Sequence, residues 1–286
     1  MTTSQTAPFD PRYIEARRTL LDALTALAPH STAVIVAGAQ AIYLRAGNVI
    51  ATVAPYTTDG DLALDPAHLE DDPELERAME SVNLTLLVKS DGNIEQGIWV
   101  GSVHVNGEDI PVQVDLLVPK SLSNTKSRGA RLGTHGKRAA RLVPGIEAIL
   151  VDHSPLTIGS LDPNDPRSVV AEVAGPASLF IAKAHKIHDR VEEGRDARLK
   201  DKDASDVIRL MQAFPPDDVA SVMADLKEHP ISGDCTTLGL AYLDEFFGAR
   251  GREGITMATR ALEFGMPSAT VEALSVAYVQ QLLRSI

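Results

Sequence analysis

The sequence has little cysteine and few aromatic side chains, and these shortages exclude several classes of protein. Its single cysteine, Cys235, rules out a disulfide framework and a cysteine-based metal cluster. Phe, Trp and Tyr make up 4% of the 286 residues, too few for a sheet that stacks RNA bases on aromatic rings. No stretch approaches the roughly 18 apolar residues of a membrane helix. The N-terminal "MTTSQTAPFDPRY" also lacks the apolar core of a signal peptide. We therefore expect a cytoplasmic protein that does not enter a membrane.

Positive charge is also scarce, except in one segment. The net charge is −12, which argues against a broadly basic nucleic-acid-binding protein. Between residues 120 and 141, however, basic residues occur without any acid: Lys120, Lys126, Arg128, Arg131, Lys137, Arg138 and Arg141. A block of this kind either attracts phosphate or is simply a solvated loop.

The first half of the chain alternates between helical and extended patterns. Apolar residues at helical spacing indicate a helix, and β-branched runs bounded by turn residues indicate a strand. Helices are predicted over 11–28, 39–47 and 72–82, and strands over 32–38, about 60–64, 84–88, 97–105 and 110–118. The last two strands flank "NGED", and Asn-Gly is a strong hairpin signal.

The second half is mostly helical. A cluster of turn residues over 160–168 predicts a loop. Pro176 then begins a helical pattern that continues to the C-terminus, with breaks at 214–218 and 248–251. The sequence therefore predicts an α+β protein with two domains. An α/β domain spans 1–175 and a helical domain spans 176–286.

Two aspartates in "TTDGDLALD" (57–65) are placed to act together. In a strand, side chains two residues apart point to the same face, so Asp59 and Asp61 would project together. Asp115, on the second strand of the hairpin, could complete a three-carboxylate site. Such a site suits Mg²⁺, which prefers oxygen ligands and often binds substrate phosphates as well. The matching chemistry is in-line transfer at phosphorus.

Other residues suit phosphate binding. Gly38 lies between a strand and a helix, where a backbone can approach a phosphate, although many such turns bind nothing. Lys183 and Arg190 are seven residues apart and nearly share a helix face. Asp203 and Asp206 are three apart on the next helix, so one of them could orient Lys183 or act as a base. The alternative for these four residues is a salt bridge between packed helices.

These motifs, in this order, resemble the nucleotidyltransferase superfamily of the DNA polymerase β type. "KAHKIHDR" followed by "KDASDVIRL" is similar to the K-x₆-R and [RK]-D-x-x-D-L signature of the AbiEii/AbiGii toxin family, which includes the MenT toxins. The resemblance covers roughly residues 30–210. It implies a nucleotidyltransferase-type mixed sheet, an NTP substrate, and Mg²⁺ or Mn²⁺.

The resemblance also implies roles for particular residues. Metal would be held by Asp59, Asp61 and Asp115, with Lys183 and Asp206 completing the catalytic set. The nucleotide would be bound by Gly38, Ala39, Gln40, Lys183, Arg190 and Asp203. The acceptor would be the 3′ end of a tRNA, contacted through Lys126, Arg128, Arg131, Lys137 and Arg138. A cognate antitoxin would be the protein partner.

Two alternatives remain open. The acceptor could be a cationic small molecule such as an aminoglycoside, which the acidic surface would suit. An acidic cleft near Asp115 would favour that acceptor, and a basic cleft would favour RNA. Otherwise the chain is a binding or regulatory protein on a degenerate nucleotidyltransferase fold. Gly38-Ala39-Gln40, where the family usually has Gly-Gly or Gly-Ser, is the main support for this second alternative.

Overall fold

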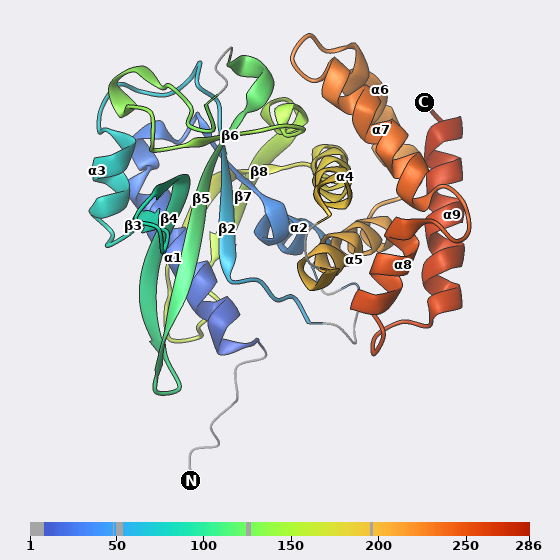
Figure 1. Cartoon of the computed structure of the whole chain (residues 1–286), viewed down its shortest axis with the longest axis horizontal. Coiled ribbons are helices and arrows are strands. Elements are labelled where there is room, and N and C mark those ends of the chain that lie inside the picture. The colour runs from blue at the N-terminus through green and yellow to red at the C-terminus, as the bar shows by residue number, and fades with distance from the viewer. Residues whose placement is uncertain (1–8, 48, 50–53, 124–126, 195–196) are drawn as a thin grey trace.

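The structure is a computed structural model that describes residues 9–47, 49, 54–123, 127–194 and 197–286. It is a mixed α+β fold in which an open mixed sheet is followed by a helical C-terminal part (Figure 1). The strands pair in the order β3-β4-β5-β2-β1-β8-β7, and β6 also pairs with β5. Their bounds are β1 Val34–Ala37, β2 Asp59–Leu64, β3 Thr85–Val88, β4 Ile94–Val105, β5 Glu108–Pro119, β6 Arg141–Val143, β7 His153–Gly159 and β8 Ser168–Ala174.

Helices cover the sheet and form the C-terminal part. The α-helices are α1 Pro11–Ala26, α2 Gly38–Ala46, α3 Leu75–Glu80, α4 Pro176–Glu193, α5 Ala197–Ala213, α6 Pro216–Glu228, α7 Gly233–Phe247, α8 Glu253–Ala261 and α9 Ser268–Arg284. Short 3-10 helices are η1 Ala28–His30, η2 Lys120–Leu122, η3 Gly133–His135 and η4 Glu147–Leu150. No described helix is long and apolar enough to cross a membrane.

The centre of the sheet separates two packing layers. β2 runs parallel to β5 and antiparallel to β1, so these three strands lie side by side. The Cα of Gly60 faces Leu20 of α1, whereas Asp61 lies against Gly38 at the start of α2. Because neighbouring residues of a strand point to opposite faces, α1 covers one face and α2 the other. Asp59 and Asp61 therefore belong to the α2 face.

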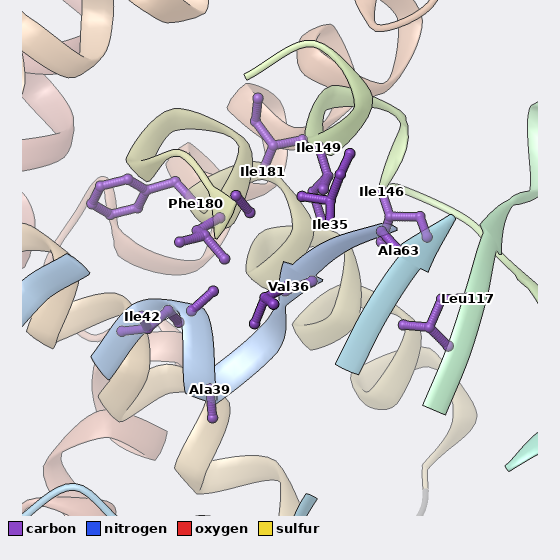
Figure 2. Packing of buried hydrophobic residues seen from close by; sticks show 14 of the residues in the cluster. Ile35, Val36, Ala39, Ile42, Ala63, Leu117, Ile146, Ile149, Phe180 and Ile181 are labelled. Carbon is purple, nitrogen blue, oxygen red and sulfur yellow. The ribbon is translucent and has the colours of Figure 1, made fainter. Parts of the chain in front are cut away.

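The core beneath that face joins the sheet to the helical part. Figure 2 shows apolar side chains of β1, α2, β2, β5, η4 and α4 packed together. The labelled ones are Ile35, Val36, Ala39, Ile42, Ala63, Leu117, Ile146, Ile149, Phe180 and Ile181. One buried cluster extends from Tyr13 in α1 to Leu282 in α9. Burying apolar surface is the main favourable contribution to folding, so this shared core holds α4 against the strands that carry the aspartates.

The predicted hairpin is confirmed, and it also positions the segment after it. Asn106 and Gly107 both have positive φ, as a tight hairpin turn requires. β4 leaves the edge of β5 at Asp115, and β6 continues pairing along the same edge from Leu117. Gly97 makes this possible, because a Cβ there would lie 2.5 Å from the backbone nitrogen of Arg141. The buried Trp99 donates its indole N–H to the Ala139 carbonyl at 2.9 Å and fixes the same segment.

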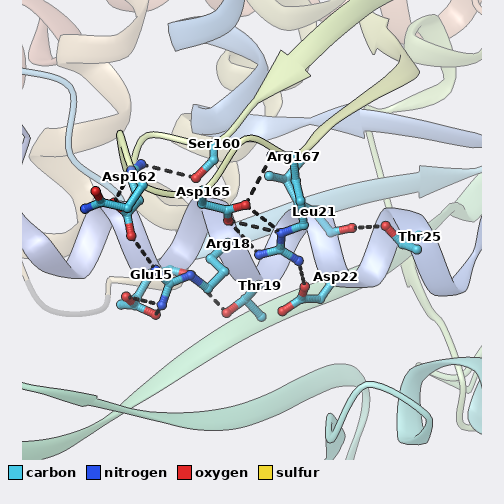
Figure 3. A network of polar contacts seen from close by, with 11 residues as sticks. Glu15, Arg18, Thr19, Leu21, Asp22, Thr25, Ser160, Asp162, Asp165 and Arg167 are labelled. Carbon is cyan, nitrogen blue, oxygen red and sulfur yellow. Dashed lines mark hydrogen bonds and ion pairs between the residues drawn. The ribbon is translucent and has the colours of Figure 1, made fainter.

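The region from 153 to 174 contains two strands that the sequence patterns did not predict. β7 and β8 form an antiparallel hairpin, and β8 pairs in parallel with β1. The predicted loop at 160–168 is the connection between them. Figure 3 shows how it is tied to α1: Arg18 pairs with Asp162 at 2.8 Å, and Arg167 pairs with Asp22. These surface pairs fix where the edge of the sheet lies against α1.

The helical part follows the predicted pattern. α4 begins at Pro176, α5 ends before the break at 214–218, and α7 ends before the break at 248–251. α4 and α5 both pack on α2, so the boundary near residue 175 is crossed by the core. The division into two domains at that point stays a prediction.

Candidate active site

Strand register brings two of the predicted aspartates together. In the parallel β2–β5 pair, Asp61 lies opposite Asp115, and Asp59 precedes Asp61 by two residues. Asp115 is buried, with 3% of its surface exposed, while Asp59 and Asp61 are partly buried. One oxygen of Asp115 accepts a hydrogen bond from Gln113 at 2.7 Å, and the other pairs with Arg141.

The three carboxylates differ in how readily they ionise. Burial and the charge of Asp61 raise the pKa of Asp115, Arg141 opposes the rise, and the net pKa is about 7. Burial also raises the pKa of Asp61, and the charge of Asp59 adds to this. Burial acts in the same direction on Asp59, but a hydrogen bond from Thr57 and the charge of Lys202 hold its pKa below the ordinary value. The site therefore carries more buried carboxylate than its neighbouring cations neutralise, and an added cation would be favoured there.

Gly38 is required by the position of Asp61. Its φ is +61°, and a Cβ at this position would lie 1.8 Å from Asp61 Oδ2. No other residue fits there without moving the carboxylate. The next two residues of the motif are turned inward: Ala39 is buried, and Gln40 is fully buried. Gln40 accepts from Arg17 Nε at 2.9 Å and donates to the Asp59 carbonyl at 3.4 Å, so its side chain braces β2.

The second predicted cluster forms between α4 and α5. The Lys183 ammonium is buried and donates to Asp203 Oδ1 and to Asp206 Oδ2, both at 2.7 Å. Arg190 also pairs with Asp203. Burial would lower the pKa of Lys183, but these two carboxylates outweigh it and raise the pKa. For Asp203, burial would raise the pKa, but the positive charge of Lys183 outweighs this and lowers the pKa. Both aspartates therefore hold Lys183, rather than one of them.

Hydrogen bonds connect the two clusters. The Tyr43 hydroxyl, from α2, donates to the Tyr56 carbonyl at 3.1 Å and lies 3.4 Å from Asp206 Oδ1. Lys202 donates to the Thr57 hydroxyl at 3.1 Å, and that hydroxyl donates to Asp59. The order of the motifs in the sequence does not reveal these links, because they depend on how α5 packs on α2.

A cavity of about 200 Å³ lies where the clusters meet. Its polar wall consists of Gly38, Asp61, Arg141, Lys183, Lys186 and Asp189, and its apolar wall includes Leu117, Ile146 and Leu179. A second cavity of about 510 Å³ adjoins it and also contains Arg141. Lys120 and Arg128 line that cavity together with Glu95, Asp189 and Glu192. The bases thus exceed the acids in the first cavity and equal them in the second.

The basic segment only partly approaches the carboxylates. Arg128 lines the second cavity, whereas Arg131, Lys137 and Arg138 are exposed and contribute to neither cavity wall. Arg138 lies 3.6 Å from Glu76 of α3. Lys126 lies outside the described residues.

Arg141 and Lys186 are site residues that the sequence prediction missed. Lys186 lies one helical turn after Lys183, and this spacing was a usable signal. Arg141 was visible only as one member of the basic segment, because its contact with Asp115 depends on the pairing of β6 with β5.

The donor set has the chemistry of a magnesium site without forming a closed cage. Among the residues that the structure describes, no three His, Cys, Asp or Glu side chains are grouped so that they could hold a metal. Mg²⁺ usually binds through one or two carboxylates, with water and substrate phosphate completing the shell. The facing pair Asp61 and Asp115, with Asp59 beside them, fits that mode of binding.

Neither a protein-family model nor a curated protein sequence matches the chain.

Proposed function

We propose that this protein is a metal-dependent nucleotidyltransferase, with a sheet of the nucleotidyltransferase type. It would transfer an NMP group from an NTP to an acceptor hydroxyl and release pyrophosphate. One observation carries the proposal: the β2–β5 register sets Asp61 opposite Asp115, and Asp61 lines a cavity together with Gly38, Lys183 and Arg141, the residue that pairs with Asp115.

Asp59 and Asp61 would hold Mg²⁺ or Mn²⁺, with Asp115 as a third ligand or as the base. Their fit rests on the oxygen-only donor set and on the raised pKa of the two facing aspartates. When bound, such an ion neutralises charge on the reacting phosphates.

The cationic side chains of the first cavity would bind the triphosphate. Lys183 is held in place by two carboxylates and presents a fixed positive charge to the cavity wall. Lys186 is 42% exposed, so it has freedom to reach a phosphate. Arg141 can grip phosphate bidentately with its planar guanidinium. Among the predicted nucleotide-binding residues, Gly38 would act through its backbone, and Gln40 by bracing Asp59.

Asp115 would take the proton in the transfer step. The acceptor oxygen forms a bond to the α-phosphorus, the bond from that phosphorus to the pyrophosphate oxygen breaks, and the hydroxyl proton passes to Asp115. A carboxyl whose pKa is about 7 is suited to accept a proton near neutral pH.

The acceptor would be the 3′ end of a tRNA, and the protein would act as a toxin opposed by a cognate antitoxin. Support comes from Lys120 and Arg128, two basic residues of the 120–141 segment that line the second cavity, although the acids of that cavity, Glu95, Asp189 and Glu192, balance them together with Arg141. A phosphate backbone is recognised by lysines and arginines placed in this way.

Transfer of α-³²P label from each of the four NTPs onto total tRNA tests the proposal. We expect Mg²⁺-dependent labelling by the wild type, and its loss in the Asp59→Ala/Asp61→Ala double variant. Asp109→Ala is the matched control, because Asp109 is an exposed aspartate on β5, and it should label normally.

Full labelling by the double variant would contradict the assignment of the site. If the wild type labels an aminoglycoside but not RNA, the small-molecule acceptor is correct. If no NTP binds in the presence of Mg²⁺, the chain is a degenerate member of the fold.

A further inference from the structure

A third cavity, of about 700 Å³, lies between the sheet part and the helical part. It is bordered by η2, η4, α4, the α6–α7 junction and α7. Pro144 and Asp189 line this third cavity, and they also line the first and second cavities described above. None of the residues predicted from the sequence for catalysis, nucleotide binding or RNA contact lines it, so it is a separate site.

The inner wall contains a carboxylate that lacks a hydrogen-bond donor on one oxygen. Glu147 is 5% exposed and lines the cavity. Its Oε1 accepts from the Ser121 backbone N–H at 3.3 Å, whereas Oε2 is buried and has no hydrogen-bond partner among the described residues. A buried carboxylate with one oxygen in this state is poorly stabilised, so a positive charge placed beside it in the cavity would be favoured.

The Cys235 thiol interacts with this carboxylate through a side-chain hydrogen bond but does not neutralise its charge. Burial raises the pKa of the Cys235 thiol to about 12, and the charge of Glu147 adds to the rise. The thiol is therefore neutral at physiological pH. Asp189 and Asp234 add acidic groups to the lining, and Lys227 is its one lysine. The charge of the wall thus favours a cation and disfavours an anion.

Aromatic rings form another part of the wall. Tyr242 stacks on His188 with ring centres 3.9 Å apart, and His185 meets it edge-on at 5.2 Å. His185 is fixed by a 2.8 Å hydrogen bond between Nε2 and the Cys235 carbonyl. Leu122 and Leu238, each nearly half exposed, contribute apolar surface. Such a wall suits a ligand with a short hydrocarbon chain and a cationic end.

We propose that this cavity binds a small organic cation, an ammonium or guanidinium on a short aliphatic chain, whose charge pairs with the Glu147 carboxylate. The proposal does not depend on nucleotide transfer, and its test uses no NTP.

Titration calorimetry of the full chain with putrescine, agmatine and the neutral 1-butanol tests the proposal. We expect the two cations to bind and 1-butanol not to bind. Glu147→Gln retains an oxygen for the Ser121 N–H and should weaken binding at least tenfold. Asp234→Asn, which removes an exposed acid of the lining, is the matched control and should weaken binding less than threefold.

A second variant provides an independent test in case Glu147→Gln misfolds. Thr237 is exposed and lines the cavity, so Thr237→Lys adds a competing ammonium without disturbing the core. It should also weaken binding at least tenfold. Failure of both cations to bind the wild type, or unchanged affinity in these two variants, would overturn the proposal. Tighter binding of a blocked lysine (N-acetyl-lysine methylamide) than of putrescine would also overturn it, because the site would then belong to a protein partner.

Discussion

At the scale of single residues, the site depends on close contacts that small substitutions would disturb. Asp61 occupies the space that a Cβ on residue 38 would need, and Gln40 is enclosed by its two hydrogen bonds. The Gly38-Ala39-Gln40 motif therefore serves the carboxylates through packing, whatever ligand the cavity accepts.

Gly38→Ala should damage both stability and metal binding. A side chain at φ +61° costs about 1–2 kcal/mol, and the displaced Asp61 carboxylate adds to that cost. Gly47→Ala, at φ +58° with nothing within 4 Å of the added carbon, isolates the backbone contribution on the same helix. Urea denaturation should show a larger loss for Gly38→Ala, and Mg²⁺ should stabilise only the Gly47 variant. Equal losses for the two variants would show that Asp61 moves freely.

At the scale of elements, the parallel pairing of β2 with β5 determines the electrostatics of the candidate site. It sets two carboxylates side by side, and Arg141 from β6 compensates only one of them directly. Ionising both aspartates in the metal-free protein therefore opposes folding.

This arrangement predicts a pH dependence of stability. The pKa of Asp115 is about 7 in the folded protein and near 3.8 in the unfolded chain, so between these values the folded state holds the extra proton. Stability of the metal-free protein should then fall as pH rises from about 4 to 7, by at most about 1.4 kcal/mol per pH unit. Tm measured in chelator from pH 5 to 8 should fall less steeply in Asp115→Asn than in the wild type. Asp109→Asn is the exposed control on β5, and a wild-type slope in Asp115→Asn would refute the prediction.

Local signals in the sequence were sufficient for the elements that local chemistry defines. Asn106-Gly107 predicted the hairpin, and Pro176 predicted the start of α4. β7 was missed because its mostly exposed residues give no clear alternation. β8 is a mostly apolar run without alternation, and its pairing with β1 spans more than a hundred residues. Arg141 was missed for the same reason, since β6 meets β5 only after the basic segment has turned back.

At the scale of the whole molecule, the buried core joins the sheet and the helices. Asp206 and Lys202 come from the helical part, while Tyr43 and Thr57 come from the sheet part. Tyr43 donates to Asp206, and Lys202 donates to Thr57. The candidate site therefore requires both parts to be folded at once.

Unfolding should accordingly be one cooperative transition. Trp99, the only tryptophan, lies in β4 and reports on the sheet, whereas far-UV circular dichroism at 222 nm is dominated by the helices of the C-terminal part. Thermal or urea transitions followed by the two signals should coincide, because neither part keeps its buried surface without the other. Separate midpoints would instead establish independent domains that divide near residue 175.

The shared wall of the three cavities has a thermodynamic consequence. Asp189 and Pro144 border the third cavity and the cavities beside the carboxylates, so a charge bound on one side alters the field on the other. If a cation and a nucleotide both bind, their affinities are linked reciprocally. Any factor by which the cation changes nucleotide affinity equals the factor by which the nucleotide changes cation affinity. The cellular supply of a small amine would then set how readily the protein takes up its nucleotide.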